Sequence, residues 1–125
     1  MIYPKNFTYK EFTCPCGCGF NCTSKRLVMA LQDLRNLIGK PIIINSACRC
    51  EKHNAEVGGV QKRADGSGGS LHMKGIAADI RVEGLSPKAL ALEAEKIFAF
   101  NNGGIGIYRT FVHVDVRGHK ARWKG

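Results

Sequence analysis

The segment 111–116, Phe-Val-His-Val-Asp-Val, constrains the fold more than any other part of this chain. Because successive side chains of a strand point to opposite faces, its three valines share one face, and Phe111, His113 and Asp115 share the other. The valine face must pack against a hydrophobic core. The opposite face carries an imidazole beside a carboxylate, and such groups are buried only with polar partners. The segment therefore predicts a strand with one apolar face and one polar, chemically active face.

Two other segments have the spacing and the end signals of α-helices. Ser24 suits the N-cap of the first, and apolar residues follow at helical spacing until Gly39 ends it. Ser86 and Pro87 suit the N-cap and the first helical position of the second, which the Asn-Asn-Gly-Gly run 101–104 ends. The predicted apolar stripe of this second helix consists of Leu90, Ala94, Ile97 and Phe98.

The remaining regular elements are predicted to be strands. The β-branched run 42–44 predicts a buried strand, and residues 76–82 predict another. Residues 105–108 and 111–116, separated by a tight turn, predict a hairpin. The order is thus helix, strand, strand, helix and hairpin. This order is typical of an α+β fold, here with a small, mostly antiparallel sheet and two main helices.

Length and charge narrow the class of protein. The 125 residues predict one domain, residues 1–125, and no apolar run approaches the ~18 residues of a membrane span. The N-terminal segment 1–10 lacks the apolar core of a signal peptide, so synthesis in the cytoplasm is expected. The net charge of +9 fits a basic surface that serves only solubility, and it equally fits an anionic partner, either nucleic acid or the acidic polymers of a bacterial cell wall. Because the basic residues are scattered, charge alone does not choose between them.

The six cysteines all lie in the first half of the chain. An even number in a small protein permits disulfides if the protein reaches an oxidising compartment. The run 14–22 could instead hold a structural metal, although its C-x-C-x-C-x₃-C spacing differs from the paired C-x₂-C knuckles of zinc ribbons. Structural thiols or disulfides, a second metal site and no bond at all therefore stay open. The residues concerned are Cys14, Cys16, Cys18, Cys22, Cys48 and Cys50.

Three residues of the second half, His72, Asp79 and His113, form a candidate ligand set. Two imidazoles and one carboxylate suit Zn²⁺ and leave a fourth position for water. His72 and Asp79 are an odd number of positions apart, so one continuous strand would point them to opposite faces. Gly75 lies between them and permits a bend that lets both aim at one point. If the three do not converge, the chain is a small basic domain without recognisable chemistry.

The pattern S-x-H-x-x-G-x-A-x-D at residues 70–79, followed by a strand with His113, resembles the signature of the zinc D-Ala-D-Ala carboxypeptidase family, peptidase family M15. The upstream segments 44–54 and 57–60 and the segment 103–108 also resemble that family. The family shares its fold with the hedgehog signalling domain. The short form with a Cys/Gly segment near its N-terminus looks like the M15 domains of phage lysins. The resemblance covers nearly the whole chain.

This resemblance implies roles for particular residues. His72, Asp79 and His113 would ligate zinc, which lowers the pKa of a bound water and polarises the scissile carbonyl. Arg49 matches the family arginine that holds a substrate carboxylate or carbonyl oxygen, a task that suits a planar guanidinium. Ser70 matches a serine beside the metal, for which structural support and substrate contact both remain open.

The chain departs from the family pattern at one position. Many members carry a catalytic Glu or Asp three residues before the last histidine ligand, where this chain has Thr110, which cannot act as a general base. Asp115 is the nearest replacement, either as the base or as a partner that orients the imidazole of His113. His119 is a further candidate for proton transfer or oxyanion contact. Trp123 either walls the cleft or packs in the core.

The sequence thus predicts a zinc metallopeptidase that cuts peptidoglycan stem peptides, as a carboxypeptidase or as an endopeptidase of the endolysin type. The alternative is a non-catalytic, zinc-stabilised module that binds the cell wall, which the missing acid at Thr110 supports. A nucleic-acid partner is disfavoured because the basic residues do not interleave with aromatics. The protein is expected to be a monomer that acts on the cell wall, in the periplasm or outside the cell, after its release.

Overall fold

A five-stranded sheet organises the protein, of which a computed structural model describes residues 2–65 and 67–125. The strand order is β1-β2-β4-β3-β5, and all neighbours are antiparallel except β3 and β5. The predicted α+β class is confirmed, but the sheet is mixed at one edge. The strands are β1 (Ile43–Ser46), β2 (Ala77–Arg81), β3 (Gly104–Ile107), β4 (Val112–Asp115) and β5 (Ala121–Lys124).

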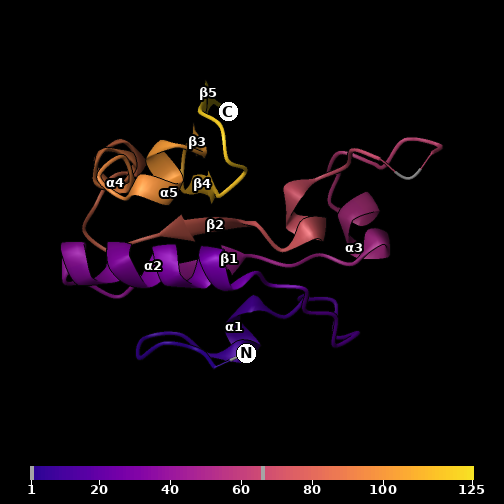
Figure 1. The fold of residues 1–125 in the computed structure, drawn as a ribbon, viewed down its shortest axis with the longest axis horizontal. Helices are drawn as coiled ribbons and strands as arrows, with labels where there is room; N and C mark the ends of the chain where they lie inside the picture. Colours follow the sequence, from indigo (N-terminus) through magenta and orange to yellow (C-terminus); the bar gives the residue numbers. More distant parts are fainter. Residues whose placement is uncertain (1, 66) are drawn as a thin grey trace.

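The two predicted helices begin at the expected caps. The hydroxyl of Ser24 accepts a hydrogen bond from the backbone of Leu27, and that of Ser86 accepts one from Ala89. Figure 1 shows α2 running beside β1 and β2, with α4 and α5 over the other half of the sheet. The helices are α1 (Tyr9–Phe12), α2 (Lys25–Ile38), α3 (Glu51–Glu56), the 3₁₀-helix η1 (Leu71–Lys74), α4 (Pro87–Ala94) and α5 (Phe98–Asn101).

The second predicted helix is wrong in its extent, because the chain leaves the helical conformation between α4 and α5. Ile97 is extended, with φ −95° and ψ 118°. Glu95, just after α4, accepts hydrogen bonds from the side chains of Arg122 and Asn101, a contact that no local pattern reveals. The break rotates the predicted apolar stripe, so that Phe98 is 76% exposed while Phe100 is fully buried.

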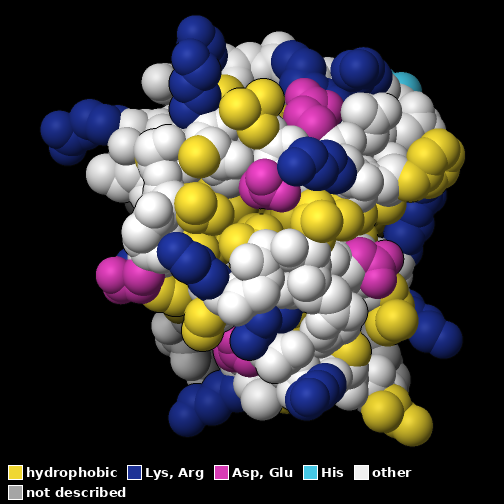
Figure 2. All heavy atoms as spheres, turned by 90° about the vertical axis from the view of Figure 1, so that its left-hand side faces the viewer, with side chains coloured by type: hydrophobic (Ala, Val, Ile, Leu, Met, Phe, Trp, Pro, Cys, Tyr) yellow, Lys and Arg dark blue, Asp and Glu magenta, His cyan; other side chains and the backbone are white. Residues whose placement is uncertain are grey.

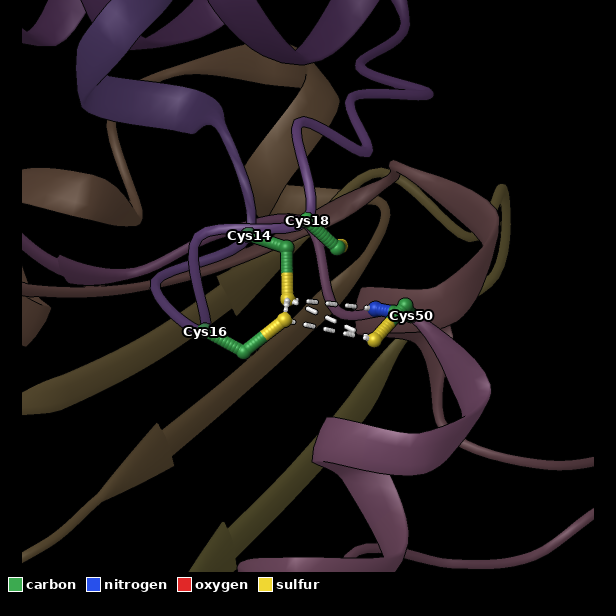
Figure 3. A group of neighbouring side chains, drawn as sticks. All are labelled: Cys14, Cys16, Cys18 and Cys50. Atoms are coloured by element: carbon green, nitrogen blue, oxygen red, sulfur yellow. Dashed lines mark hydrogen bonds between the residues drawn. The ribbon is translucent and has the colours of Figure 1, made fainter.

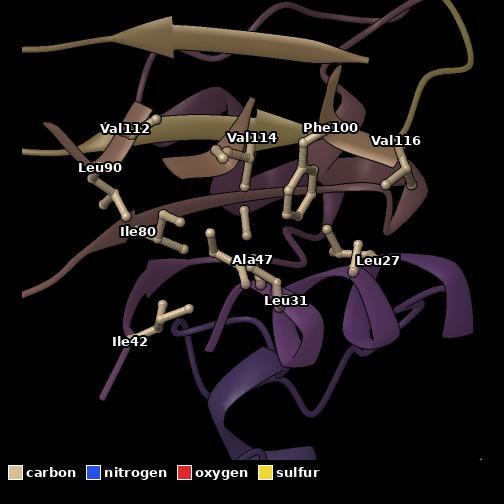
Figure 4. Packing of buried hydrophobic residues seen from close by; sticks show 14 of the residues in the cluster. Leu27, Leu31, Ile42, Ala47, Ile80, Leu90, Phe100, Val112, Val114 and Val116 are labelled. Carbon is tan, nitrogen blue, oxygen red and sulfur yellow. The ribbon is translucent and has the colours of Figure 1, made fainter. Parts of the chain in front are cut away.

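The hydrophobic core lies between the helices and one face of the sheet. The valine face of β4 is part of it, as predicted, since Val112 and Val114 are fully buried. Figure 4 shows these side chains meeting Leu31 from α2, Leu90 from α4 and Phe100 from α5. Because α2 and α4 pack on this face, the opposite face of the sheet is left to carry polar chemistry.

The edge strand β5 was not predicted from the sequence. It is held by contacts with residues that are distant from it in the sequence. The Arg122 guanidinium donates to both carboxylate oxygens of Glu95 and to the carbonyls of Gly103 and Asn101. These hydrogen bonds tie β5 to the segment that links α4 to β3. Trp123 follows at once, so the strand brings the single tryptophan of the chain to the sheet.

The surface carries its basic residues in a dispersed arrangement. Figure 2 shows Lys and Arg side chains spread over one face of the molecule, with Asp and Glu among them. This face therefore has no single basic patch of the kind that tracks a nucleic-acid backbone. Among the described residues, no helix is long and apolar enough to cross a membrane.

Candidate metal centre

One row of residues crosses all five strands on the face opposite the core. Ser46 pairs with Asp79, Asp79 with His113, His113 with Gly106, and Gly106 with Trp123. Directly paired residues of neighbouring strands point to the same face. A side chain at Gly106 would collide with the indole of Trp123, since a Cβ there would lie 2.4 Å from it. The missing side chain lets Trp123 approach His113, and the two ring centroids are 5.0 Å apart.

His72 joins this row from the 3₁₀-helix that precedes β2. Gly75 ends η1 in the left-handed conformation with φ 71°, and so supplies the predicted bend between His72 and Asp79. The carboxylate oxygen Oδ1 of Asp79 then lies 3.4 Å from His72 Nε2 and 3.2 Å from His113 Nδ1. Potential ligand atoms of all three residues lie within 4.8 Å of one another. The structure therefore brings the three predicted ligands together.

The second nitrogen of each imidazole has an acceptor of its own. His72 Nδ1 lies 2.8 Å from the carbonyl oxygen of Ala47, and His113 Nε2 lies 2.7 Å from a carboxylate oxygen of Asp115. A carbonyl and a carboxylate only accept, so these nitrogens carry the protons. In the neutral form of each imidazole, the nitrogen that faces Asp79 then carries the lone pair, and a metal ion would take the place of any proton held between that nitrogen and the carboxylate. Two imidazoles and one carboxylate, oriented in this way, fit a Zn²⁺ ion.

The three side chains are mostly withdrawn from solvent and electrostatically coupled. Burial on its own would raise the pKa of Asp79, but hydrogen bonds from His113 and His72 outweigh it and hold that pKa well below its usual range. Burial would lower the pKa of His113, but hydrogen bonds to Asp115 and Asp79 leave it above the ordinary value. The centre therefore keeps Asp79 ionised, as a metal ligand must be.

Asp115 is fully buried directly behind His113. One of its carboxylate oxygens accepts from His113 and from Arg117 Nη2 at 2.8 Å. The other accepts from the backbone of Gly104 at 2.8 Å and from Arg117 Nε at 2.9 Å. Burial would raise the pKa of Asp115, but hydrogen bonds from His113 and Arg117 hold it well below its usual range. Every oxygen of this carboxylate is thus engaged.

Arg49 lies on the other side of Asp79, and its guanidinium is held at three points. Its Nη2 is 3.5 Å from Asp79 Oδ2, its Nη1 donates to Asn54 Oδ1, and its Nε donates to the hydroxyl of Ser46. Burial is the main reason that the pKa of Arg49 is lowered, and Asp79 offsets part of that effect. Asn54 is itself fully buried, and its amide also donates to the carbonyl of Val60. Asn54 thereby ties Arg49 to the segment beside the pocket.

The other predicted site residues lie at different distances from the ligands. Ser70 caps η1, and its hydroxyl accepts a hydrogen bond from the backbone of His72, which gives it a supporting contact. His119 is exposed and lines the same pocket as the three ligands. Thr110 is exposed in the turn between β3 and β4.

The ligands open onto a cavity of about 660 Å³, a size suited to a small ligand or a short peptide. Its lining includes Trp123, for which a place in the cleft wall was one of two predictions, and also Tyr108 and Arg117. The sequence did not single out Tyr108 or Arg117 as functional. Arg117 could have been found, because it continues the alternation of His113 and Asp115 along the same face. Tyr108 had no such signal, since the hydroxyl that accepts from Trp123 Nε1 contacts a residue on another strand.

Comparison with known proteins gave one family match. A search of curated proteins returned no significant match to the chain. A family model described as peptidase M15 matches residues 5–115, which include all three candidate ligands, Arg49 and Asp115. Since this match spans most of the sequence, the chain belongs to the peptidase M15 family.

Proposed function

We propose that this protein is a zinc peptidase that hydrolyses the stem peptides of peptidoglycan. His72 would bind the metal through Nε2, His113 through Nδ1, and Asp79 through its carboxylate. The observation that carries the proposal is the pair of acceptors, the Ala47 carbonyl and Asp115, which hold one nitrogen of each imidazole and turn the other toward Asp79. A bound zinc ion would supply Lewis-acid polarisation of the scissile carbonyl and a water of lowered pKa.

The charge and shape of the pocket favour a peptide that ends in a carboxylate. Arg49 and Arg117 line it, although Arg117 is already paired with the buried Asp115, and Asp79 is the acidic residue among the lining residues. The guanidinium of Arg49, held by Asn54 and Ser46, is already oriented beside the metal centre. A guanidinium fixed in this way binds a carboxylate without losing the freedom of a mobile side chain. Arg49 is therefore our candidate for the substrate anchor.

Within this proposal Asp115 orients the ligand His113 and does not act as the general base. Its oxygens are occupied by His113, Arg117 and the backbone of Gly104, and the side chain is fully buried. A base must reach the proton that it removes. His119 is exposed and lines the same pocket as the candidate ligands. We assign the proton transfer to His119.

Digestion of purified peptidoglycan tests the proposal. The zinc-loaded protein is expected to release D-alanine or to split peptide cross-links, and mass analysis of the muropeptides would identify which bond is cut. Protein treated with a chelator should leave the muropeptides unchanged, and added zinc should restore cleavage. If the zinc-loaded protein sediments with the wall but leaves every muropeptide intact, the peptidase proposal fails and the non-catalytic wall-binding module is the correct function.

Replacing Asp115 with asparagine separates an orienting role from a catalytic one. The amide would place N–H groups against donors that now meet a carboxylate, so His113 should lose its fixed orientation. We expect zinc affinity at this centre and peptidase activity to fall together, by about 10–100-fold. Competition with a chelating dye measures the affinity. Asp33→Asn, at an exposed position of α2, is the matched control and should change neither.

The opposite outcome for Asp115→Asn would also be clear. If activity disappears while zinc affinity stays at the wild-type value, Asp115 acts in the chemical step and our assignment of His119 is wrong.

A further inference from the structure

A second cluster of potential metal ligands lies outside the pocket. The Sγ atoms of Cys14, Cys16, Cys18 and Cys50 all lie within 4.8 Å of one another. Figure 3 shows Cys14, Cys16 and Cys50 directing their sulfurs at a common point, with Cys18 beside them. All four are free thiols. We infer that these four cysteines form a structural zinc site, separate from the candidate metal centre.

The spacing of the sulfurs fits a single tetrahedral ion. A Zn–S bond is about 2.3 Å, so sulfurs at the corners of a tetrahedron around zinc are about 3.8 Å apart. Cys14 and Cys16 are 3.4 Å apart, and each lies 3.7 Å from Cys50. Four thiolates close the coordination shell and leave no position for water, which is the arrangement of structural zinc sites.

Backbone amides are already aimed at three of the four sulfurs. The N–H of Cys50 donates to Cys14 Sγ at 3.4 Å, and that of His53 donates to Cys50 Sγ at the same distance. The N–H of Phe20 donates to Cys18 Sγ at 3.5 Å. Hydrogen bonds from backbone amides to the ligand atoms fix the orientation of a metal site. The backbone around the cluster therefore already holds three of its four sulfurs in place.

The local backbone explains how a C-x-C-x-C run can converge. Gly17 and Gly19 have φ of 86° and 83°, so the chain curls after Cys16 and again after Cys18. The backbone N–H of Cys14 donates to the carbonyl of Phe20 at 2.8 Å and closes the loop. The fourth ligand, Cys50, comes from a distant segment.

The sequence offered the run 14–22 as a source of four ligands, and the structure gives a different set. Cys22 is not part of the cluster: its sulfur lies 3.7 Å from Cys48 and 3.3 Å from the carbonyl of Met73. Cys50 takes its place. Cys22 is therefore a control position within the same run.

The site would anchor the segment that carries the candidate substrate arginine. Cys50 directly follows Arg49, whose backbone N–H donates to the carbonyl of His72 at 3.1 Å. A zinc ion shared by the loop 14–18 and Cys50 would fasten the N-terminal part of the chain to this segment. Two of its sulfurs are on exposed residues, Cys16 and Cys18, so the ion lies near the surface and contributes rigidity without opening onto the pocket.

Cobalt substitution of the intact protein tests this inference, and the readout does not depend on peptidoglycan hydrolysis. The candidate metal centre contains no sulfur, so strong thiolate-to-cobalt charge-transfer absorption in the near ultraviolet reports cobalt bound to cysteines and not to that centre. We expect this absorption in the wild type and in His113→Ala. In the zinc form, the four thiols should resist a thiol reagent, and a chelator should expose them.

Variants then assign the ligands. Cys16→Ser is expected to lose the charge-transfer absorption and one equivalent of bound zinc, whereas Cys22→Ser should keep both. Absence of the absorption from the folded, cobalt-loaded wild type would overturn the inference, as would disulfides among the four cysteines in the purified protein. Since these two results are read on the unmutated chain, misfolding of a variant cannot obscure them.

Discussion

Replacing His113 with alanine is expected to abolish peptidoglycan hydrolysis and to remove one equivalent of zinc. The variant loses one of three ligands and also leaves the buried carboxylate of Asp115 without its partner at 2.7 Å. The loss should exceed the ~10–100-fold expected when a partner of a ligand is removed. Zinc analysis and muropeptide digestion measure the two effects. The zinc of the four-cysteine site should remain, because it shares no ligand with this centre.

The matched control for this experiment is His53→Ala. His53 is a histidine of α3 that lies outside the ligand cluster and does not line the pocket. This variant should retain both zinc and activity. If His113→Ala retained full activity, or if it lost zinc no more readily than His53→Ala, the assignment of His113 as a ligand would be wrong.

Replacing Gly75 with alanine is expected to destabilise the protein strongly and to weaken the metal centre. A Cβ at this position would lie 2.1 Å from the carbonyl oxygen of Cys22 and 2.6 Å from its carbonyl carbon. These are backbone atoms, so no side chain can turn away to relieve the collision. The left-handed φ of 71° adds its own cost of about 1–2 kcal/mol for a residue with a side chain. Because Gly75 ends η1, the relaxation must displace His72.

Gly39→Ala is the matched control for this second prediction. Gly39 ends α2 with φ 72°, nearly the same conformation, but a Cβ there would meet nothing within 4 Å. Its loss of unfolding free energy should therefore be limited to the conformational cost of about 1–2 kcal/mol. Urea unfolding of the two variants measures the difference. Equal losses in the two variants would show that the contact with Cys22 does not matter.

Local signals were sufficient for the elements that close within a few residues. Ser24 and Ser86 cap their helices through the amides three residues later, and Gly39 ends α2 as expected. The alternation of residues 111–116 likewise placed the valines in the core and His113 on the opposite face. These features depend on hydrogen bonds and periodicities that are complete within one element, so the amino-acid types alone predict them.

Contacts between distant segments decided the features that the sequence missed. The helix predicted after Ser86 is interrupted where Glu95 contacts Arg122, a residue 27 positions later. The same arginine holds β5 in place. The parallel pairing of β5 with β3 makes the sheet mixed. The residues next to Glu95 and Arg122 in the sequence give no indication that the two side chains form an ion pair. A local sequence pattern therefore could not predict this contact.

For the metal centre, residue types and their spacing were enough to predict which side chains suit zinc and where the chain bends to unite them. Which nitrogen of each imidazole faces Asp79 depends on contacts between distant segments, because the acceptors on the other side are the Ala47 carbonyl and Asp115. Such contacts also bring Cys50, and not Cys22, into the cysteine cluster. The physical reason is the same in both cases. Ligand types are properties of single residues, whereas the partner that orients a ligand comes from whichever segment the folded chain places beside it.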